Sequence, residues 1–268
     1  MSSSRFATLS VVKALHVHHD ANSSSGLIAE LLAERQIDSV VHQVCLQSGS
    51  PSGSPVFPDP SQFDLIIVYG SRWSVYESAV EHWVTPELEF LRHADQLGVA
   101  VLGMCFGGQL LSVAHGGKVA PGLNPEIGWL SVEPTQTSVD TPAGQVAEDA
   151  PRPSPNPSPV IIDPGPWMQW HFDCFEVPSG AEALARSPIA PQAFLLRRNL
   201  AVQFHPEVNR AVLEEWFVDD LDQLTAVGVD PQSLLIEADR QALASRERTS
   251  RLLESFLALR SAKNKNVF

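Results

Sequence analysis

Cys105 is the residue of this chain whose surroundings most clearly favour nucleophilic chemistry. An apolar run at residues 99–103 leads into Gly-Met-Cys-Phe-Gly at residues 103–107, and a helical pattern follows. A nucleophile between two glycines, at a strand-to-helix turn, is typical of a nucleophile elbow. The N-terminus of the helix would stabilise a thiolate, and the backbone N–H of Phe106 could bind a developing oxyanion. The alternative is a small buried cysteine whose glycines serve close packing.

A histidine and a glutamate further along the chain supply the groups that a cysteine nucleophile needs. Leu-Ala-Val-Gln-Phe-His-Pro-Glu at residues 200–207 has the pattern of an apolar strand that ends in His205 and Glu207. Residues i and i+2 of an extended segment face the same side, so the carboxylate can reach the imidazole. Glu207 would then orient His205, and His205 would exchange protons with Cys105. Such a pair on its own is more often a surface ion pair, so the prediction rests on both motifs together.

Together the two motifs resemble the class I glutamine amidotransferase domain, which carries G-x-C-x-G-x-Q and then Q-F-H-P-E. The matching segments are residues 103–109 and 203–207, and the resemblance extends over roughly residues 11–210, with most likeness to free-standing, GMP-synthase-like members. It implies a flavodoxin-like α/β fold and a catalytic triad of Cys105, His205 and Glu207. A thiol α/β-hydrolase is not favoured, because in that fold the acid precedes the histidine.

The same resemblance assigns the other site residues. The backbone N–H groups of Gly70 and Phe106 would form the oxyanion hole. Many family members have Gly-Gly-Pro where this chain has Gly-Ser-Arg at residues 70–72, a departure that bears on the shape of the substrate pocket. His171 is not expected to be a second base, because one histidine already serves the cysteine. The residues expected to bind substrate are Gln109, Trp170, His171 and Phe172.

The implied reaction is hydrolysis of the γ-amide of glutamine through a γ-glutamyl thioester, which releases glutamate and ammonia. This chemistry requires no cofactor and no metal. The chain shows no P-loop and no synthetase domain, so a separate synthetase is the expected acceptor of ammonia. Two alternatives stay open: a free-standing γ-glutamyl peptidase or hydrolase that acts on γ-glutamyl conjugates, and a non-enzymatic regulatory protein with the same fold.

Composition limits the partners. The 268 residues include 31 acidic and 18 basic ones, a formal net charge of −13. This balance argues against nucleic acid or an anionic membrane, because either needs a basic patch. No apolar stretch is long enough to predict a transmembrane helix, and the first residues do not have the pattern of a signal peptide. Three scattered cysteines are too few for a disulfide framework, which favours a reducing cytoplasm.

Short apolar runs that alternate with helical patterns predict an open, mostly parallel, twisted sheet with helices on both faces. The expected strands, each buried on both faces, are residues 11–17, 39–45, 65–69 and 99–103. A helix from residue 27 should be capped by the serines before it, and another should cover residues 78–96. From residue 206 onward the pattern is helical, with a break at residues 228–231.

We expect an amidotransferase domain over residues 1–210, with a Pro-rich insertion at about residues 135–166. A helical extension over residues 211–268 should pack on this domain, because its apolar stripe needs burial. A second loop, residues 48–62, is rich in Ser, Pro and Gly. Four residues near the N-terminus have metal-ligand types, but a cysteine nucleophile needs no metal, and we favour a polar strand-to-helix loop near the crevice. They are His16, His18, His19 and Asp20.

Overall fold

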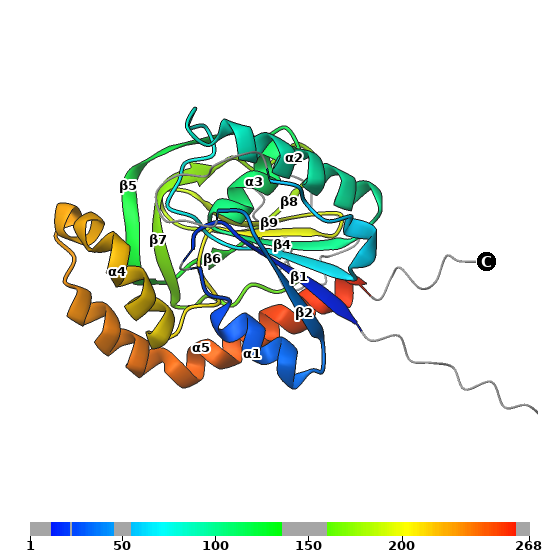
Figure 1. Ribbon diagram of the computed structural model, residues 1–268. Coiled ribbons are helices and arrows are strands. Elements are labelled where there is room, and N and C mark those ends of the chain that lie inside the picture. Colours follow the sequence, from blue (N-terminus) through cyan, green and yellow to red (C-terminus); the bar gives the residue numbers. More distant parts are fainter. Residues whose placement is uncertain (1–11, 22, 46–54, 136–159, 261–268) are drawn as a thin grey trace, which may run out of the picture.

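The structure, a computed structural model, describes residues 12–21, 23–45, 55–135 and 160–260. Its main sheet has the strand order β2-β1-β3-β4-β10-β9-β8-β6 (Figure 1). The first five strands in this order run parallel, and they are β2 (Asp38–Gln43), β1 (Lys13–His18), β3 (Leu65–Val68), β4 (Ala100–Met104) and β10 (Asn199–Val202). Three antiparallel strands extend the sheet: β9 (Pro191–Leu196), β8 (Glu182–Arg186) and β6 (Glu133–Pro134). The predicted mostly parallel α/β fold is confirmed.

Helices cover both faces of the sheet (Figure 1). On one face lie α1 (Gly26–Glu34) and the C-terminal half of α5 (Pro231–Arg260), and on the other lie α2 (Glu81–Gln96) and α3 (Phe106–Ala114). The strand β3 shows the pattern: Leu65 and Ile67 face the first layer, and Ile66 and Val68 face the second. All four residues are fully buried, as strands between two helical layers must be.

The strand β2 differs from the prediction of burial on both faces. Val40 and Val41 are 39% and 56% exposed, because β2 lies at the edge of the sheet and has only β1 as a neighbour. Apolar, β-branched residues favour a strand at any position in a sheet, so their presence does not distinguish an edge from a centre.

The start of α1 also differs from the prediction, because no serine side chain caps it. Ser25 occupies the N-cap position without a capping hydrogen bond, and its hydroxyl lies 2.8 Å from Nε2 of His18. The N–H of Leu27 instead donates to the backbone oxygen of Glu207, at 2.9 Å. Gly26 has φ +44°, and a Cβ there would lie 2.1 Å from the same oxygen. The first turn of α1 is therefore anchored on the chain around Glu207.

A two-stranded antiparallel ribbon, β5 (Val119–Leu130) and β7 (Trp167–Phe175), stands beside the main sheet (Figure 1). The helix α4 (Arg210–Val227) and the N-terminal half of α5 pack on β7. The break predicted at residues 228–231 is confirmed: α4 ends at Gly228, which has φ +72°, and α5 begins at Pro231. Most of the predicted insertion at residues 135–166 and part of the loop at residues 48–62 lie outside the described residues.

Two short elements complete the description. A 3₁₀ turn, Pro60–Gln62, precedes β3 and begins at Asp59, whose side chain accepts a hydrogen bond from the N–H of Ser61. Among the described residues, no helix combines the length and the apolar character that crossing a membrane requires.

The position of α5 generates a stability prediction. Phe256 is fully buried under the sheet, whereas Leu243 on the same helix is 81% exposed. We expect Phe256→Ala to lower the free energy of unfolding by about 3–5 kcal/mol, because it removes buried apolar area and leaves a cavity. Leu243→Ala should change it by less than about 0.5 kcal/mol. Urea unfolding followed by tryptophan fluorescence measures both, and equal midpoints for the two variants would contradict the described packing of α5.

Candidate active site

Cys105 lies at the turn between β4 and α3, in the geometry predicted for an elbow. Its φ of +51° and ψ of −110° form a strained combination for a residue with a side chain. The N–H of Cys105 donates to the carbonyl of Val202 in β10, at 2.9 Å. A Cβ on Gly103 would lie 2.4 Å from the oxygen of Gly107, and a Cβ on Gly107 would lie 2.3 Å from the oxygen of Val68. Both glycines are therefore required by close backbone approach.

His205 and Glu207 meet as the sequence predicts, although not in an extended strand. The strand β10 ends at Val202, and Glu207 lies in the turn that follows. The backbone N–H of His205 donates to the carbonyl of Met168 in β7, at 2.8 Å, which fixes the turn against the ribbon. Nδ1 of His205 lies 2.7 Å from Oε1 of Glu207, and the two residues are 4% and 1% exposed.

The electrostatics of this group favour a charged imidazole. Burial alone would lower the pKa of His205, but the Glu207 carboxylate and the hydrogen-bonded side chain of Cys105 raise it, to about 10. The ring is then protonated at neutral pH and donates to a carboxylate on one side and to the sulfur on the other. Such an arrangement allows the imidazole to exchange a proton with the sulfur.

Gly70 follows β3 and lies directly against this pair. A Cβ on Gly70 would lie 3.0 Å from Cε1 of His205 and 3.7 Å from Cβ of Cys105, so no larger residue fits without displacing the imidazole. Phe106, the other residue predicted for the oxyanion hole, opens α3, where backbone N–H groups have no partner within the helix. Its ring is buried between the sheet and the helices α2 and α3, and Phe106 is not among the residues that line the pocket.

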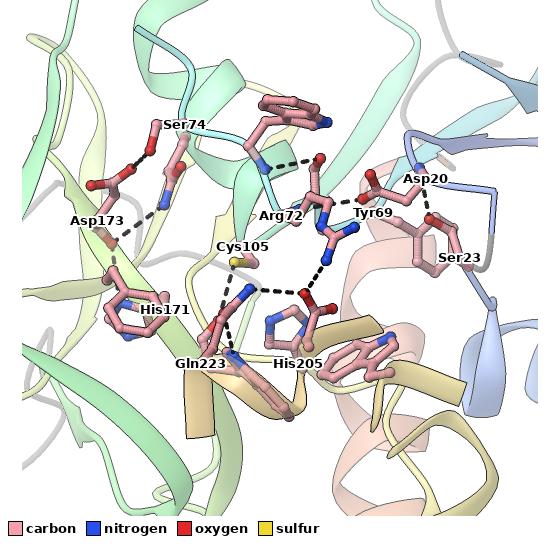
Figure 2. Close-up of a pocket in the computed structure, with 18 of the residues that line it drawn as sticks. Asp20, Ser23, Tyr69, Arg72, Ser74, Cys105, His171, Asp173, His205 and Gln223 are labelled. Atoms are coloured by element: carbon pink, nitrogen blue, oxygen red, sulfur yellow. Dashed lines mark hydrogen bonds and ion pairs between the residues drawn. The ribbon is translucent and has the colours of Figure 1, made fainter. Parts of the chain in front are cut away.

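The residues predicted to bind substrate come together around one pocket (Figure 2). Gln109 donates through Nε2 to the carbonyl of Asp173, at 3.3 Å, and Nδ1 of His171 lies 3.0 Å from the same oxygen. The carbonyl of Trp170 lies 3.8 Å from Sγ of Cys105. Phe172 is 41% exposed. All four predicted residues line the pocket together with Cys105, His205 and Glu207.

One wall of the pocket was missed by the sequence reasoning. It is formed by Trp216, Asp220 and Gln223 of α4. The ring of Trp216 meets the imidazole of His205 edge-on, with centroids 4.8 Å apart, and Gln223 accepts from the indole N–H of Trp170, at 3.1 Å. The spacing i, i+4, i+7 places all three side chains on one face of a helix, and this pattern was available in the sequence.

Arg72, which stands where many family members have proline, contacts the same wall of the pocket. Nη2 of Arg72 lies 2.6 Å from Oδ1 of Asp220 and 3.0 Å from the carbonyl of Asp219. The backbone N–H of Arg72 donates to the carboxylate of Asp20, at 3.2 Å. The loop after β3 is thereby joined to α4 beside the sulfur (Figure 2).

Asp173 directly follows the predicted substrate-binding residues in the sequence and was not among them, yet it joins two pocket elements. Its carboxylate accepts hydrogen bonds from the hydroxyls of Ser74 and Tyr76, the latter at 2.8 Å. These contacts hold the loop between β3 and α2 to β7. Ser23 and Ser24, from the segment before α1, also line the pocket.

Of the four residues near the N-terminus, His19 and Asp20 lie in the predicted loop between β1 and α1, whereas the other two do not. His16 and His18 lie on β1 and are buried, where they contact Tyr69, Ser39 and Ser25. Burial lowers the pKa of both rings to about 4, so they are neutral. Asp20 does reach the pocket. Within the described part of the chain, no group of three or more His, Cys, Asp or Glu residues could hold a metal ion.

The two other cysteines are free and differ from Cys105. Cys45 is buried, and Cys174 is partly buried in β7. Burial raises the pKa of each thiol to about 11, so both are protonated at neutral pH. Neither thiol lines the pocket that holds Cys105.

The fold and the grouping of these residues define an α/β protein with a cysteine-centred site at a strand-to-helix turn. Residues 17–220 match the family model for class I glutamine amidotransferases, so the chain belongs to the class I glutamine amidotransferase family. The match runs from the end of β1 into α4 and includes the three residues predicted as a triad.

Curated relatives agree with this assignment. The chain is 28% identical over 195 residues to a glutamine-hydrolysing GMP synthase of Bifidobacterium longum, a match that covers 72% of this chain and 32% of that protein. It is 37% identical over 145 residues to the GMP synthase of Thermomicrobium roseum, with 53% and 23% covered. The match therefore spans about a third or less of the length of these relatives.

Solved structures share the fold along almost the whole chain. A glutamine amidotransferase from Thermotoga maritima has a TM-score of 0.72 at 23% identity, with 91% of this chain and 97% of that chain covered. A glutamine amidotransferase from Methylobacillus flagellatus has a TM-score of 0.74 at 20% identity, with 93% and 96% covered. The coverage includes a large part of the C-terminal helices.

The pairing of His205 with Glu207 generates a titration prediction. In Glu207→Gln the carboxylate that raises the pKa of His205 is gone, while burial, which lowers the pKa, and the Cys105 side chain, which raises it, both remain, so the pKa should fall from about 10. The ring of the variant should therefore lose its proton at a lower pH than the ring of the parent protein. Nitrogen NMR of labelled imidazoles measures this. Glu215→Gln, at an exposed position on α4, is the matched control. Identical His205 titrations in the parent and in Glu207→Gln would refute the assignment.

Proposed function

We propose that this chain hydrolyses the γ-amide of glutamine through a Cys105–His205–Glu207 triad and a γ-glutamyl thioester, releasing glutamate and ammonia. The observation that carries the proposal is a buried group of three contacting residues. Cys105 has a strained backbone and is hydrogen-bonded to His205, and Nδ1 of His205 lies 2.7 Å from Glu207. A surface ion pair or a packing cysteine needs none of these features.

Each residue has a role in the reaction. The thiolate of Cys105 attacks the γ-carbonyl carbon, and the N–H groups of Gly70 and Phe106 bind the oxyanion, where a donor is worth about 3–4 kcal/mol. His205 gives its proton to the leaving nitrogen, so ammonia departs and the thioester forms. The neutral ring then takes a proton from water, the hydroxide attacks the thioester, and glutamate leaves as the thiolate is restored.

The amino-acid end of the substrate is assigned to the side of the pocket that holds Gln109, His171 and Asp173. The carbonyl of Trp170 lies 3.8 Å from Sγ of Cys105 and can accept a hydrogen bond from an α-ammonium group, whereas the carbonyl of Asp173 is already paired with Gln109 and His171. Gln109 already spans from α3 to β7 in this region and would position the bound amino acid. Trp170 and Phe172 supply apolar walls.

We propose that the ammonia passes to a separate synthetase subunit. The curated relatives are named glutamine-hydrolysing GMP synthases, and the match covers 32% or less of their length in the two cases above.

A second candidate is the hydrolysis of γ-glutamyl conjugates with larger leaving groups, and the extent of the pocket favours it. Asp173, Ser74 and His171 lie on one side of Cys105, and Asp20 and Ser23 lie on the opposite side (Figure 2). The pocket therefore continues past His205, the group that would protonate the leaving amine. Ammonia would leave this polar extension unfilled, whereas an amino acid or amine could occupy it.

The first test is glutamate release from L-glutamine and from a panel of γ-glutamyl amides and peptides. We expect Cys105→Ala to lower the rate by at least about 10⁴-fold, as loss of a triad nucleophile does in other hydrolases. Cys45→Ala, which removes a thiol outside the pocket, is the matched control and should keep the parent rate. Release that persists in Cys105→Ala would contradict the proposed triad. Absence of release from every substrate would favour the regulatory alternative.

The bridge between Arg72 and Asp220 generates a selectivity prediction. Arg72→Ala should loosen the link between the loop after β3 and α4 and widen the side of the pocket beyond His205. The ratio of kcat/KM for γ-glutamyl peptides to that for glutamine should rise by at least about threefold, in line with the modest energy of a partly exposed ion pair. Arg240→Ala breaks an exposed pair within α5 and serves as the control. An unchanged ratio in Arg72→Ala would show that the bridge does not select substrates.

A further inference from the structure

A second buried ion pair lies behind the site, and the proposed chemistry does not use it. Nε2 of His19 lies 3.0 and 3.1 Å from the two carboxylate oxygens of Glu87 in α2. Both side chains are 0% exposed, and neither lines the pocket. Burying charged groups costs desolvation free energy even when they are paired, so stability alone does not explain this ion pair.

His19 is held as a double donor. Burial alone would lower the pKa of the ring, but the Glu87 carboxylate more than offsets this, and the pKa is raised. The protonated ring donates from Nε2 to Glu87 and from Nδ1 to the carbonyl of Gly70, at 3.2 Å. The same ring packs edge-on against Phe106, with centroids 4.9 Å apart. His19 therefore contacts both residues assigned to the oxyanion hole.

Two hydrogen bonds hold the peptide units on either side of Gly70. The carbonyl of Tyr69, one peptide earlier, accepts from the N–H of Gly107, at 3.2 Å. The carbonyl of Gly70 itself is held by His19. The first of these bonds holds the planar peptide unit that carries the N–H of Gly70, and the second holds the unit that follows, so together they limit rotation about φ and ψ of the glycine between them. Gly70 has no side chain whose packing could limit its conformation.

We propose that His19, charged and oriented by Glu87, is a positioning residue that holds Gly70 in the conformation the oxyanion hole requires. This inference rests on the proposed function. Loss of His19 frees the peptide unit after Gly70 and leaves the unit that carries the N–H with the Gly107 bond alone, so the N–H can shift. A displaced N–H weakens binding of the oxyanion and leaves the ground-state contacts of glutamine intact, so kcat falls with little change in KM.

Two double variants separate this role from a structural one. His19→Leu with Glu87→Leu replaces the pair by apolar side chains of similar size, which a buried site tolerates, and removes the donor to Gly70. His19→Asn with Glu87→Gln also removes both charges but keeps an N–H near the position of Nδ1. The variants therefore differ in the donor to Gly70.

Each variant is assayed for glutamate release from glutamine and for the rate of Cys105 alkylation by iodoacetamide. Alkylation needs the thiolate and His205 but forms no oxyanion. We expect the Leu/Leu variant to lose at least about tenfold in kcat, with KM and the alkylation rate within about twofold of the parent. The Asn/Gln variant should recover most of the loss. Thermal unfolding of both variants verifies that they are folded.

Three results would overturn the proposal: an unchanged kcat in the Leu/Leu variant, a parallel loss of alkylation and hydrolysis, or equal losses in the two variants. The second result would assign the pair to the structure of the elbow. A parent protein that alkylates but releases no glutamate from any substrate would refute the proposed function itself, and the inference with it. The two failures are therefore distinguishable.

Discussion

The contact between His205 and Glu207 is the interaction on which the rest of the site depends. A carboxylate with almost no exposure to water is stable there because a charged imidazole lies 2.7 Å away. Three elements converge to hold this pair. The ribbon strand β7 fixes the backbone of His205, the first turn of α1 is anchored on the carbonyl of Glu207, and Trp216 of α4 packs on the imidazole. The fold excludes water from the pair and directs one ring nitrogen of His205 towards the sulfur of Cys105.

The elbow of Cys105 depends on the sheet in a similar way. Its strained backbone is stabilised by neighbours: β10 accepts its N–H, β3 passes within contact of Gly107, and α3 begins at the next residue. The same crowding brings Gly70 against the imidazole and leaves no room for a Cβ there. A parallel sheet with the order β3-β4-β10 thus brings the three chain segments of the site to one edge.

The parts of the molecule that could be predicted are those governed by local pattern. The buried strands β1, β3 and β4, the elbow, the contact of His205 with Glu207 and the break at Gly228 all follow from short-range signals. The strand β8 has the sequence Glu-Ala-Leu-Ala-Arg, whose residues favour helices, and it is a strand only because β9 pairs with it. Pairing with β9 therefore overrides the helical propensity of these residues. The exposure of β2 likewise follows from its place at the edge.

The wall contributed by α4 was not predicted for a different reason. The helical face of Trp216, Asp220 and Gln223 is visible in the sequence, but its partner is not. Only the folded chain brings Arg72 to within 2.6 Å of Asp220, across 148 positions. The ion pair of His19 and Glu87 was hidden in the same way, since the sequence suggested only a cluster of ligand-type residues.

The most direct test of the account is covalent labelling with a thiol-reactive chloroketone or diazoketone analogue of glutamine, followed by peptide mass spectrometry. The account predicts one label, on Cys105, formed at neutral pH and blocked by excess L-glutamine. Cys45 and Cys174 should remain unlabelled, because burial raises the pKa of both thiols to about 11. A Cys105 that does not react, or one whose reaction L-glutamine does not block, would contradict the central claim that this cysteine attacks the γ-carbonyl of a glutamine-like substrate.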